Sequence, residues 1–222
     1  MPIGDAMLFP NYSFCLNLGG FANVSFNQNN KLIAYDICPA NIVLNAISLR
    51  LGKKFDPKGM LAAKGKINET ILKKLNTLAY YKLKPPKSLG KEWVLSTIIP
   101  LLKKSGSNPL DLLRTFTEHI AIQIAQINEQ VPTENFKSIP LEHENITKSI
   151  FITGGGTYNE FLLERIKAHS INKITIPDKK TIEFKEALIF AFLGVLRWRN
   201  EVNCLKSVTG ATTDSIVGCI YL

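Results

Sequence analysis

The sequence has 222 residues, of which 45% are hydrophobic and 20% are charged. This balance is typical of a globular protein with a sizeable core, and no apolar run reaches the ~18 residues that cross a bilayer. The net charge is +9. Because the lysines are scattered and do not alternate with aromatics, they favour solvated helix faces over nucleic-acid binding, although they would still attract anions.

The compartment is predicted from two features of the sequence. The first residues, MPIGDAMLFP, lack the basic and apolar regions of a signal peptide. The four cysteines (Cys15, Cys38, Cys204 and Cys219) lack the spacing of a zinc or redox site, and their neighbours are apolar. We therefore expect a cytoplasmic protein with cysteines packed in its core, no directly bound metal and no membrane contact.

The first predicted elements are three short strands, at residues 13–18, 21–27 and 31–36. Gly19 and Gly20 separate the first two, and a primed turn with positive φ is expected there. The three strands predict an antiparallel meander. Asn41 is then expected to cap a helix that ends at Gly52.

The rest of the chain alternates between helical and extended patterns. Further helices are predicted at residues 69–81, 91–104, 110–130, 157–169 and 183–199, with Pro100 kinking or shortening the second of them. Further strands are predicted at residues 149–153, 173–177 and 215–222, and loops at residues 53–66 and 131–147. A meander followed by this alternation predicts an α/β fold with a mixed sheet flanked by helices. The helix at residues 183–199 is apolar on nearly all sides, so it is expected to be central.

Two glycine-rich turns could bind a phosphate or a nucleotide. Gly19–Gly20 lies in the hairpin, where it could also be no more than a tight turn. Gly154–Gly156 lies between a strand and a helix, where free N–H groups and the helix dipole favour an anion. Neither turn matches the phosphate loop of nucleotide hydrolases or the dinucleotide fingerprint.

Three ionisable residues are candidates with an alternative each. Asp36, at a strand end, could hold magnesium through water or orient a substrate hydroxyl, or it could cap the turn before the next helix. Glu186, which is expected to begin the apolar helix, needs a partner or a ligand, unless the helix N-terminus alone favours it. His119 has no recognisable nucleophile partner, so a packed or hydrogen-bonded histidine is expected.

Seven segments in this order resemble the second half of the anhydro-N-acetylmuramic acid kinase family. They are LNLGGFANVSF, YDICPANIVLN, PPKSLGKEW, TEHIA, FITGGGTYNEFL, FKEALIFAFLG and SVTGA. The resemblance implies a ribonuclease H-like lobe of the actin, Hsp70 and sugar kinase superfamily. It also implies ATP and Mg²⁺ as cofactors, and phosphorylation of 1,6-anhydro-N-acetylmuramic acid to N-acetylmuramic acid 6-phosphate during cell-wall recycling.

The resemblance also implies roles for individual residues. Gly19, Gly20 and Asn23 would face the β- and γ-phosphates. The adenosine site would be lined by Gly154, Gly155, Gly156 and Asn159. Asp36, Asn41 and Glu186 would lie near magnesium or the sugar, although YDICPAN departs from the family pattern at residues 37, 38 and 40.

Residues 1–12 resemble the segment that joins the two lobes of this family. The first-lobe phosphate motif and the catalytic Asp of the family are not found, so residues 1–222 are expected to be the second lobe alone. Two alternatives stay open. One is a non-catalytic module that completes a separate first lobe or forms a homodimer, and the other is a different acetamido-sugar kinase or ATPase of the superfamily.

Overall fold

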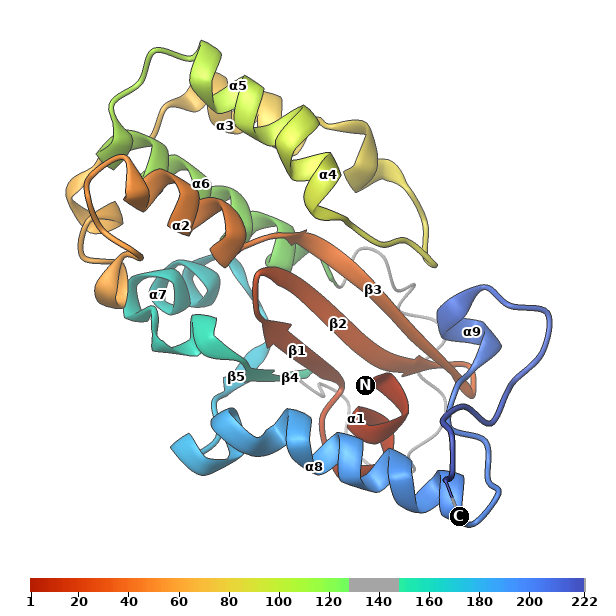
Figure 1. Cartoon of the computed structure of the whole chain (residues 1–222). Coiled ribbons are helices and arrows are strands. Elements are labelled where there is room, and N and C mark those ends of the chain that lie inside the picture. Colours follow the sequence, from red (N-terminus) through yellow and green to blue (C-terminus); the bar gives the residue numbers. More distant parts are fainter. Residues whose placement is uncertain (128–147, 222) are drawn as a thin grey trace.

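A five-stranded mixed sheet forms the centre of the fold in the computed structural model, which describes residues 1–127 and 148–221 (Figure 1). The strands are β1 (Phe14–Leu18), β2 (Phe21–Gln28), β3 (Lys31–Pro39), β4 (Ser149–Thr153) and β5 (Lys173–Thr175). Their order is β3-β2-β1-β4-β5. β1, β2 and β3 pair antiparallel, whereas β4 is parallel to β1 and β5 is parallel to β4. The predicted α/β class, with a meander leading into a mixed sheet, is confirmed.

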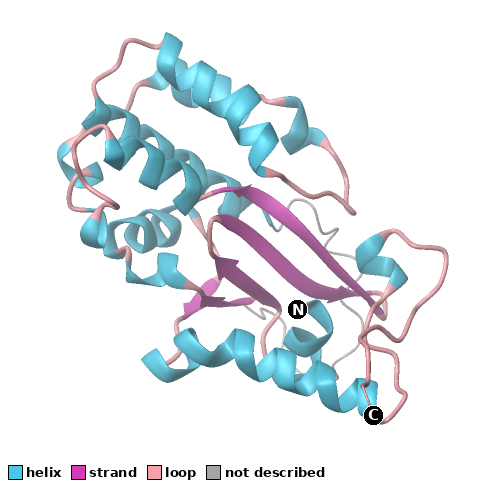
Figure 2. Cartoon of the chain, viewed as in Figure 1, coloured by secondary structure: helices cyan, strands magenta, loops and turns pink. Residues whose placement is uncertain are grey.

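Helices cover both faces of this sheet (Figures 1 and 2). They are α1 (Pro2–Leu8), α2 (Asn41–Leu49), α3 (Glu69–Asn76), α4 (Lys91–Trp93), α5 (Ile99–Lys104), α6 (Pro109–Ala125), α7 (Glu160–His169), α8 (Lys179–Trp198) and α9 (Lys206–Thr209). α2, α6 and α7 lie on one face, and α1 and α8 lie on the other. The end of the predicted helix 110–130 and the predicted loop 131–147 fall outside the described residues. No described helix is both long enough and apolar enough to cross a membrane.

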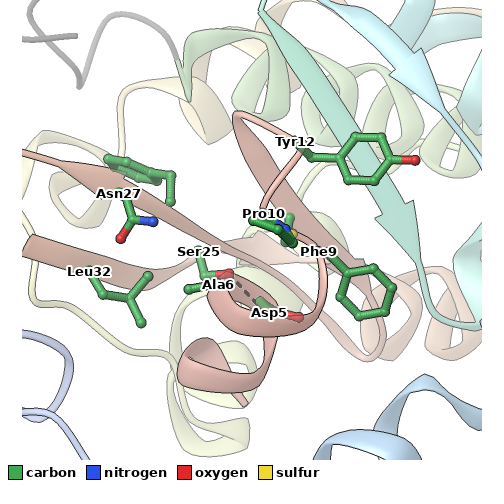
Figure 3. A pocket seen from close by; sticks show the side chains of 10 residues that line it. Asp5, Ala6, Phe9, Pro10, Tyr12, Ser25, Asn27 and Leu32 are labelled. Atoms are coloured by element: carbon green, nitrogen blue, oxygen red, sulfur yellow. Dashed lines mark hydrogen bonds between the residues drawn. The ribbon is translucent and has the colours of Figure 1, made fainter. Parts of the chain in front are cut away.

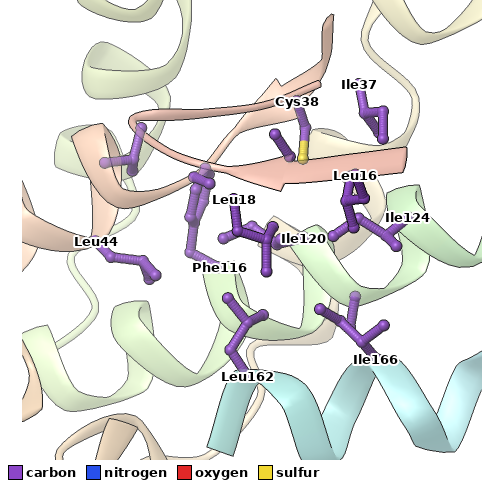
Figure 4. Packing of buried hydrophobic residues seen from close by; sticks show 14 of the residues in the cluster. Leu16, Leu18, Ile37, Cys38, Leu44, Phe116, Ile120, Ile124, Leu162 and Ile166 are labelled. Carbon is purple, nitrogen blue, oxygen red and sulfur yellow. The ribbon is translucent and has the colours of Figure 1, made fainter. Parts of the chain in front are cut away.

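The main core lies between the sheet and the layer of α2, α6 and α7 (Figure 4). Alternate residues of β1 point into it, because successive side chains of a strand face opposite sides. They meet one apolar stripe of α6 and one of α7, and each buried side chain of this size contributes roughly 1.5–3 kcal/mol. The residues in this contact include Leu16, Leu18, Phe116, Ile120, Ile124, Leu162 and Ile166.

The positive φ angles expected at Gly19–Gly20 occur in the next turn instead. Asn29 and Asn30 have φ values of 51° and 60°, and they close the β2–β3 hairpin as its two-residue loop. Neither Gly19 nor Gly20 is among the positive-φ glycines of the described chain. Leu18 pairs with Ala22, so three residues span the first turn, and a primed two-residue turn is not required there.

The expected Asn41 cap is also wrong, because α2 begins at Asn41 and Ala40 precedes it without a side-chain cap. The N–H groups of Ala40 and Ile42 donate to the carbonyl of Gly20 at 2.8 and 3.1 Å, and that of Asn41 donates to the carbonyl of Gly19. The hairpin turn therefore satisfies the free donors at the start of α2, a task that a capping side chain usually performs.

Two predicted helices are interrupted. The helix expected at residues 69–81 ends at Asn76, and a short 3-10 turn follows at Ala79–Lys82. The helix expected at residues 91–104 contains a π-helical turn at Val94–Ile98 just before Pro100. Proline has no N–H to donate, so the widened turn is the local adjustment to it. A helix at Pro2–Leu8 was not predicted.

The C-terminal region differs most from the predictions. α8 begins at Lys179 and is capped by Asp178, so Glu186 lies within it and does not begin it. Among the described residues, the helix is peripheral, because it packs through one side only, on α1, β4 and the turn Gly155–Tyr158. In place of the predicted last strand, the described tail forms a single bridge between Cys204 and Ser215. Cys219 is exposed and Cys204 is only partly buried, so just two of the four cysteines are core residues.

Candidate functional site

A row of polar residues crosses the sheet on the face that carries α1 and α8. Thr153 pairs with Asn17 across β4 and β1, Asn17 pairs with Asn23 across β1 and β2, and Asn23 pairs with Asp36 across β2 and β3. Residues directly opposite each other on neighbouring strands project from the same face. Four strands therefore align one hydroxyl, two carboxamides and one carboxylate in a line, which we call the polar row.

The two glycine turns meet beside this row. β1 and β4 run parallel, so their carboxyl ends reach the same edge of the sheet, and the turns Gly19–Gly20 and Gly154–Gly156 follow them directly. Gly154 and Gly156 lie against Asn17 and Leu18 so closely that an added Cβ would come within 3 Å of them. Two segments that are more than 130 residues apart in sequence thus form one surface.

The glycines of the two turns fall into two groups. Gly154 has a φ of 89°, and a Cβ there would be 2.5 Å from Asn17 Oδ1, so only glycine fits. Gly156 is held by contact with Leu18. By contrast, a Cβ at Gly155 would meet nothing within 4 Å, and those at Gly19 and Gly20 would make only ordinary contacts. These three glycines are not required by internal packing, and they leave the backbone accessible to a ligand.

Backbone donors remain free at both turns. No hydrogen bond from the N–H of Gly20, Gly155 or Gly156 is found within the described residues. The carbonyl of Gly154, in contrast, accepts from both the N–H and the hydroxyl of Thr157, which fixes the second turn. Free N–H groups on a rigid, glycine-lined surface are suited to bind the oxygens of a phosphate.

Asp36 lies at the β3 end of the polar row, and one of its two carboxylate oxygens already accepts a hydrogen bond within the chain. Its Oδ2 accepts from the N–H of Leu89 at 2.8 Å, and its own N–H donates to the carbonyl of Lys87. Burial raises the pKa of the Asp36 carboxyl, and the Leu89 hydrogen bond opposes that rise. Asp36 therefore does not cap the turn before α2, as one alternative supposed, but attaches the segment Lys87–Leu89 to the edge of the sheet.

Of the other predicted site residues, Asn41 and Asn159 lie at or near the second turn, whereas Glu186 has no bond to the polar row among the residues that the structure describes. The Asn41 carboxamide nitrogen lies 3.5 Å from the position that a Cβ of Gly156 would take, so it borders the second turn. The side-chain oxygen of Asn159 caps α7 by accepting from the N–H of Leu162, which leaves only its NH₂ for a ligand. Glu186 is exposed on α8, and in the described chain no hydrogen bond or ion pair links it to the polar row.

The sequence did not single out Asn17 and Thr153. Asn17 is the only polar residue of the strand FCLNL, and Thr153 is the last residue before Gly154. An uncharged polar residue inside an apolar strand was the available signal, but it could not show which residues lie opposite it on other strands.

Two sets of residues lie outside the site. His119 is fully buried and bonded to Tyr81 and Asn76, which confirms the expected packed histidine. Across the described residues, no group of three or more His, Cys, Asp or Glu side chains could hold a metal ion. Any cation at the polar row would need ligand oxygens besides Asp36.

Comparison with known proteins places this geometry in context. The family model described as anhydro-N-acetylmuramic acid kinase matches residues 6–222. A Saccharophagus degradans protein of that name is 32% identical over 214 residues, covering 92% of this chain and 54% of the relative. A Mannheimia succiniciproducens protein of the same name is 29% identical, covering 93% of this chain and 56% of the relative. The chain thus spans little more than half the length of the curated relatives it matches.

Among solved structures, component A of the (R)-2-hydroxyglutaryl-CoA dehydratase of Acidaminococcus fermentans is similar at 17% identity and a TM-score of 0.49. The match covers 85% of this chain and 63% of that protein. A likeness of this size adds nothing to the assignment of the site.

Proposed function

This chain belongs to the anhydro-N-acetylmuramic acid kinase family, and we propose that it forms the nucleotide-binding wall of an ATP-dependent sugar kinase. The observation that carries the proposal is the meeting of both glycine turns beside the polar row. Phosphoryl transfer depends mainly on positioning and on charge stabilisation. A rigid surface with free N–H groups provides part of both.

The roles proposed for the residues follow their places in the site. Gly19, Gly20 and Asn23 would contact the β- and γ-phosphates, since the free N–H of Gly20 lies in the turn that joins β1 and β2, the two central strands of the polar row. Asn17, between the two turns, would orient the same phosphates through its carboxamide.

The adenosine part of the nucleotide is assigned to the second turn. Gly154, Gly155, Gly156 and the NH₂ of Asn159 would line it. The open Cβ side of Gly155 supports this assignment, because a planar base or a ribose can approach the backbone there. Gly154 and Gly156 would hold the turn in shape and would contact the ligand only through their backbone.

Magnesium fits this wall as an ion shared with the ligand. Mg²⁺ is usually bound by one or two carboxylates together with substrate phosphates and water. Asp36 is the carboxylate of the polar row, and its Oδ1 is not used by the Leu89 hydrogen bond. Bound ATP–Mg²⁺ would supply the phosphoryl group, while the chain's own residues bind and orient it.

The acceptor proposed for the whole kinase is 1,6-anhydro-N-acetylmuramic acid, and the product is N-acetylmuramic acid 6-phosphate. Asn41 and Glu186 are the residues of this chain proposed to lie toward the sugar. We place the reaction in the cytoplasm, where ATP is available. The lobe would be of the ribonuclease H-like type, and the catalytic base would come from the part of the family that this chain does not match.

An apolar face of α8 that no other described residue covers supports the proposal that a second lobe packs here. Phe184, Leu188, Val195 and Trp198 are between 50% and 73% exposed. With Ala191 they repeat at intervals of four, three, four and three residues, the spacing of a helix-packing seam. We call these five residues the outer seam. Exposed apolar area of this kind marks an interaction surface. The two curated relatives each contain a further region, nearly half of their length, that this chain does not match, and we propose that a lobe of that kind covers the outer seam.

A coupled ADP-release assay tests the kinase proposal. The purified chain, given ATP, Mg²⁺ and 1,6-anhydro-N-acetylmuramic acid, is expected to bind nucleotide without measurable turnover, because one wall cannot enclose the reacting groups. The full-length Saccharophagus degradans relative is the positive control. Clear turnover by the 222-residue chain would contradict the half-site proposal, and failure to bind nucleotide would contradict the nucleotide wall itself.

A further inference from the structure

A buried ion pair lies next to Thr153, the residue that precedes the second glycine turn. Lys185 of α8 places its ammonium 2.7 Å from Asp5 Oδ1 of α1, and the Lys185 side chain is only 3% exposed. The same ammonium donates to the hydroxyl of Thr153 at 3.2 Å. Asp5 in turn accepts from the hydroxyl of Ser25 at 2.8 Å (Figure 3).

These contacts connect two strands of the sheet, one on either side of β1. Thr153 ends β4 and Ser25 lies in β2, while Cys15 of β1 lies between them, paired in register with Ser25 on one side and Phe151 on the other. The path Thr153–Lys185–Asp5–Ser25 therefore passes over β1, next to the polar row. Each end of the path is close to a predicted ligand contact, because Gly154 follows Thr153 directly and Asn23 is two residues before Ser25.

The surroundings of Lys185 hold it in one position. Its ammonium lies 5.5 Å from the ring centre of Phe9 and 5.7 Å from that of Phe151, and these two rings stack on each other. Beside Asp5 there is a cavity of about 20 Å³, lined by Asp5, Ser25 and Asn27 among others (Figure 3). That volume holds about one water molecule.

Stability alone is a weak reason for such an arrangement. Burying two charges costs desolvation energy that their attraction often only balances, and apolar residues of similar volume are commonly as stable. What an apolar pair could not do is donate a hydrogen bond to Thr153 and accept one from Ser25. The specific consequence of the pair is a fixed geometry between the ends of β4 and β2.

We propose that Lys185 is a positioning residue for the nucleotide site: its ion pair with Asp5 and its bond to Thr153 fix the turn Gly154–Gly156 relative to the β1–β2 hairpin. The proposal rests on the proposed function for its consequence, namely nucleotide affinity. Its structural part does not, because the order of the turn can be measured without any ligand.

The test measures hydrogen–deuterium exchange in the full chain at the backbone amides of Thr157 and Asn159, which donate to the carbonyls of Gly154 and Gly156 and so report on the order of the turn. Lys185→Met removes the charge but keeps the length of the side chain, and exchange there is expected to rise about tenfold as the turn opens locally. Thr153→Val, which leaves the ion pair in place, provides the same test if Lys185→Met does not fold, and Lys185→Arg is expected to restore most of the protection.

Ile189→Ala is the matched control, because Ile189 lies one turn further along the same buried side of α8 and packs against Gly4. It loosens α8 without removing the link to Thr153. If the foldable variants of Lys185 and Thr153 raise exchange at the turn no more than Ile189→Ala does, the pair is merely structural and the proposal is wrong.

Titration with a fluorescent ATP analogue separates this proposal from the proposed function. A several-fold weaker affinity in Thr153→Val, with Ile189→Ala unchanged, supports both. Should the unsubstituted chain fail to bind the analogue, the nucleotide assignment falls, while the exchange data still decide whether Lys185 positions the turn.

Discussion

At the scale of single residues, the glycines of the two turns divide by the reason each position is glycine. Gly154 combines a left-handed backbone with a close approach to Asn17, so its requirement is internal. Gly155 has neither constraint. A glycine without an internal reason, placed next to free N–H groups, indicates an external contact. This distinction depends on the folded environment, which is why the run GGG alone could not reveal it.

Alanine substitutions at these two positions should have opposite effects. Gly154→Ala is expected to destabilise the chain by about 1–3 kcal/mol, because alanine is strained at positive φ and meets Leu18. Gly155→Ala is expected to leave the free energy of unfolding unchanged while weakening ATP binding. Urea unfolding and nucleotide titration of both variants check this pair, and a large loss of stability in Gly155→Ala would refute the distinction.

A second residue-scale feature is the buried carboxylate of Glu118, which joins α6 to α7. It accepts hydrogen bonds from Arg165, His169 and Arg114. Burial alone would raise the pKa of Glu118, but these hydrogen bonds outweigh it and bring the pKa to about 2. Next to it on α6, burial lowers the pKa of His119 to about 3.

These two shifts define an acid-sensitive range. Because the pKa of Glu118 is lower in the folded chain, its contribution is complete above about pH 4.5 and is lost as the pH falls toward 2. In the unfolded chain His119 takes up a proton below about pH 6.5, whereas in the folded chain it does so only near pH 3. The free energy of unfolding therefore falls as the pH is lowered from about 6.5 to 3.

Glu118→Gln is expected to cost about 1–3 kcal/mol at pH 7, because it leaves the half-buried guanidinium groups of Arg114 and Arg165 without their carboxylate. It should also flatten the pH dependence of stability below pH 4.5, with the part due to His119 remaining. Urea unfolding of both proteins between pH 7 and pH 3 measures this. If the free energy of unfolding of the variant falls just as steeply below pH 4.5, Glu118 is not the cause of the acid sensitivity.

At the scale of secondary-structure elements, local pattern predicted the five strands of the sheet but also a C-terminal strand that does not form in the described tail, and it predicted the helix environments poorly. The alternation and turn residues of residues 13–36 are local signals, so the meander followed from them. Whether α8 is central or peripheral depends on what packs against it. A helix that is apolar on nearly all sides is compatible with a central position and with a peripheral one. The start of α2 was misread because its donors are satisfied by Gly19 and Gly20, which lie over twenty residues earlier.

Of the candidate site, the sequence alone indicated the two glycine turns and Asp36. It could not indicate the polar row, since a row is created by strand register. Asn17 and Thr153 are more than 130 residues apart and become neighbours only when β1 and β4 pair. The Lys185–Asp5 pair escaped notice for the same reason, because it links the two ends of the chain.

The two sides of α8 provide a prediction at this scale. Ile189→Ala, on the buried side, is expected to destabilise the chain by about 2–4 kcal/mol. The double substitution Leu188→Gln and Trp198→Gln, in the outer seam, is expected to change stability by less than about 1 kcal/mol. It should also reduce self-association and binding of an apolar dye.

Light scattering at several concentrations, together with urea unfolding, distinguishes these outcomes. If the unsubstituted chain were monomeric at all concentrations and bound no dye, the outer seam would not be an interaction surface. A dimer that dissociates on substitution of the seam would favour a second copy of the chain as its occupant over a separate lobe.

At the scale of the whole molecule, the described residues form one sheet with a site at its edge and an uncovered helix beside it. The chain matches little more than half of its curated relatives, and we propose that it offers a surface for binding nucleotide from one side. Such a surface can hold a ligand weakly without excluding water, and closure around the reacting groups is a property of two lobes. This chain is therefore expected to bind nucleotide but not to catalyse phosphoryl transfer.

The most direct test is a titration of the ¹⁵N-labelled chain with ATP–Mg²⁺, followed by NMR through the backbone amide signals of the glycines. The account expects the signals of Gly19, Gly20, Gly155 and Gly156 to shift together and to saturate with one shared dissociation constant, because both turns contact the same molecule. Shifts confined to one turn, or two turns that saturate at different concentrations, would contradict a single nucleotide site.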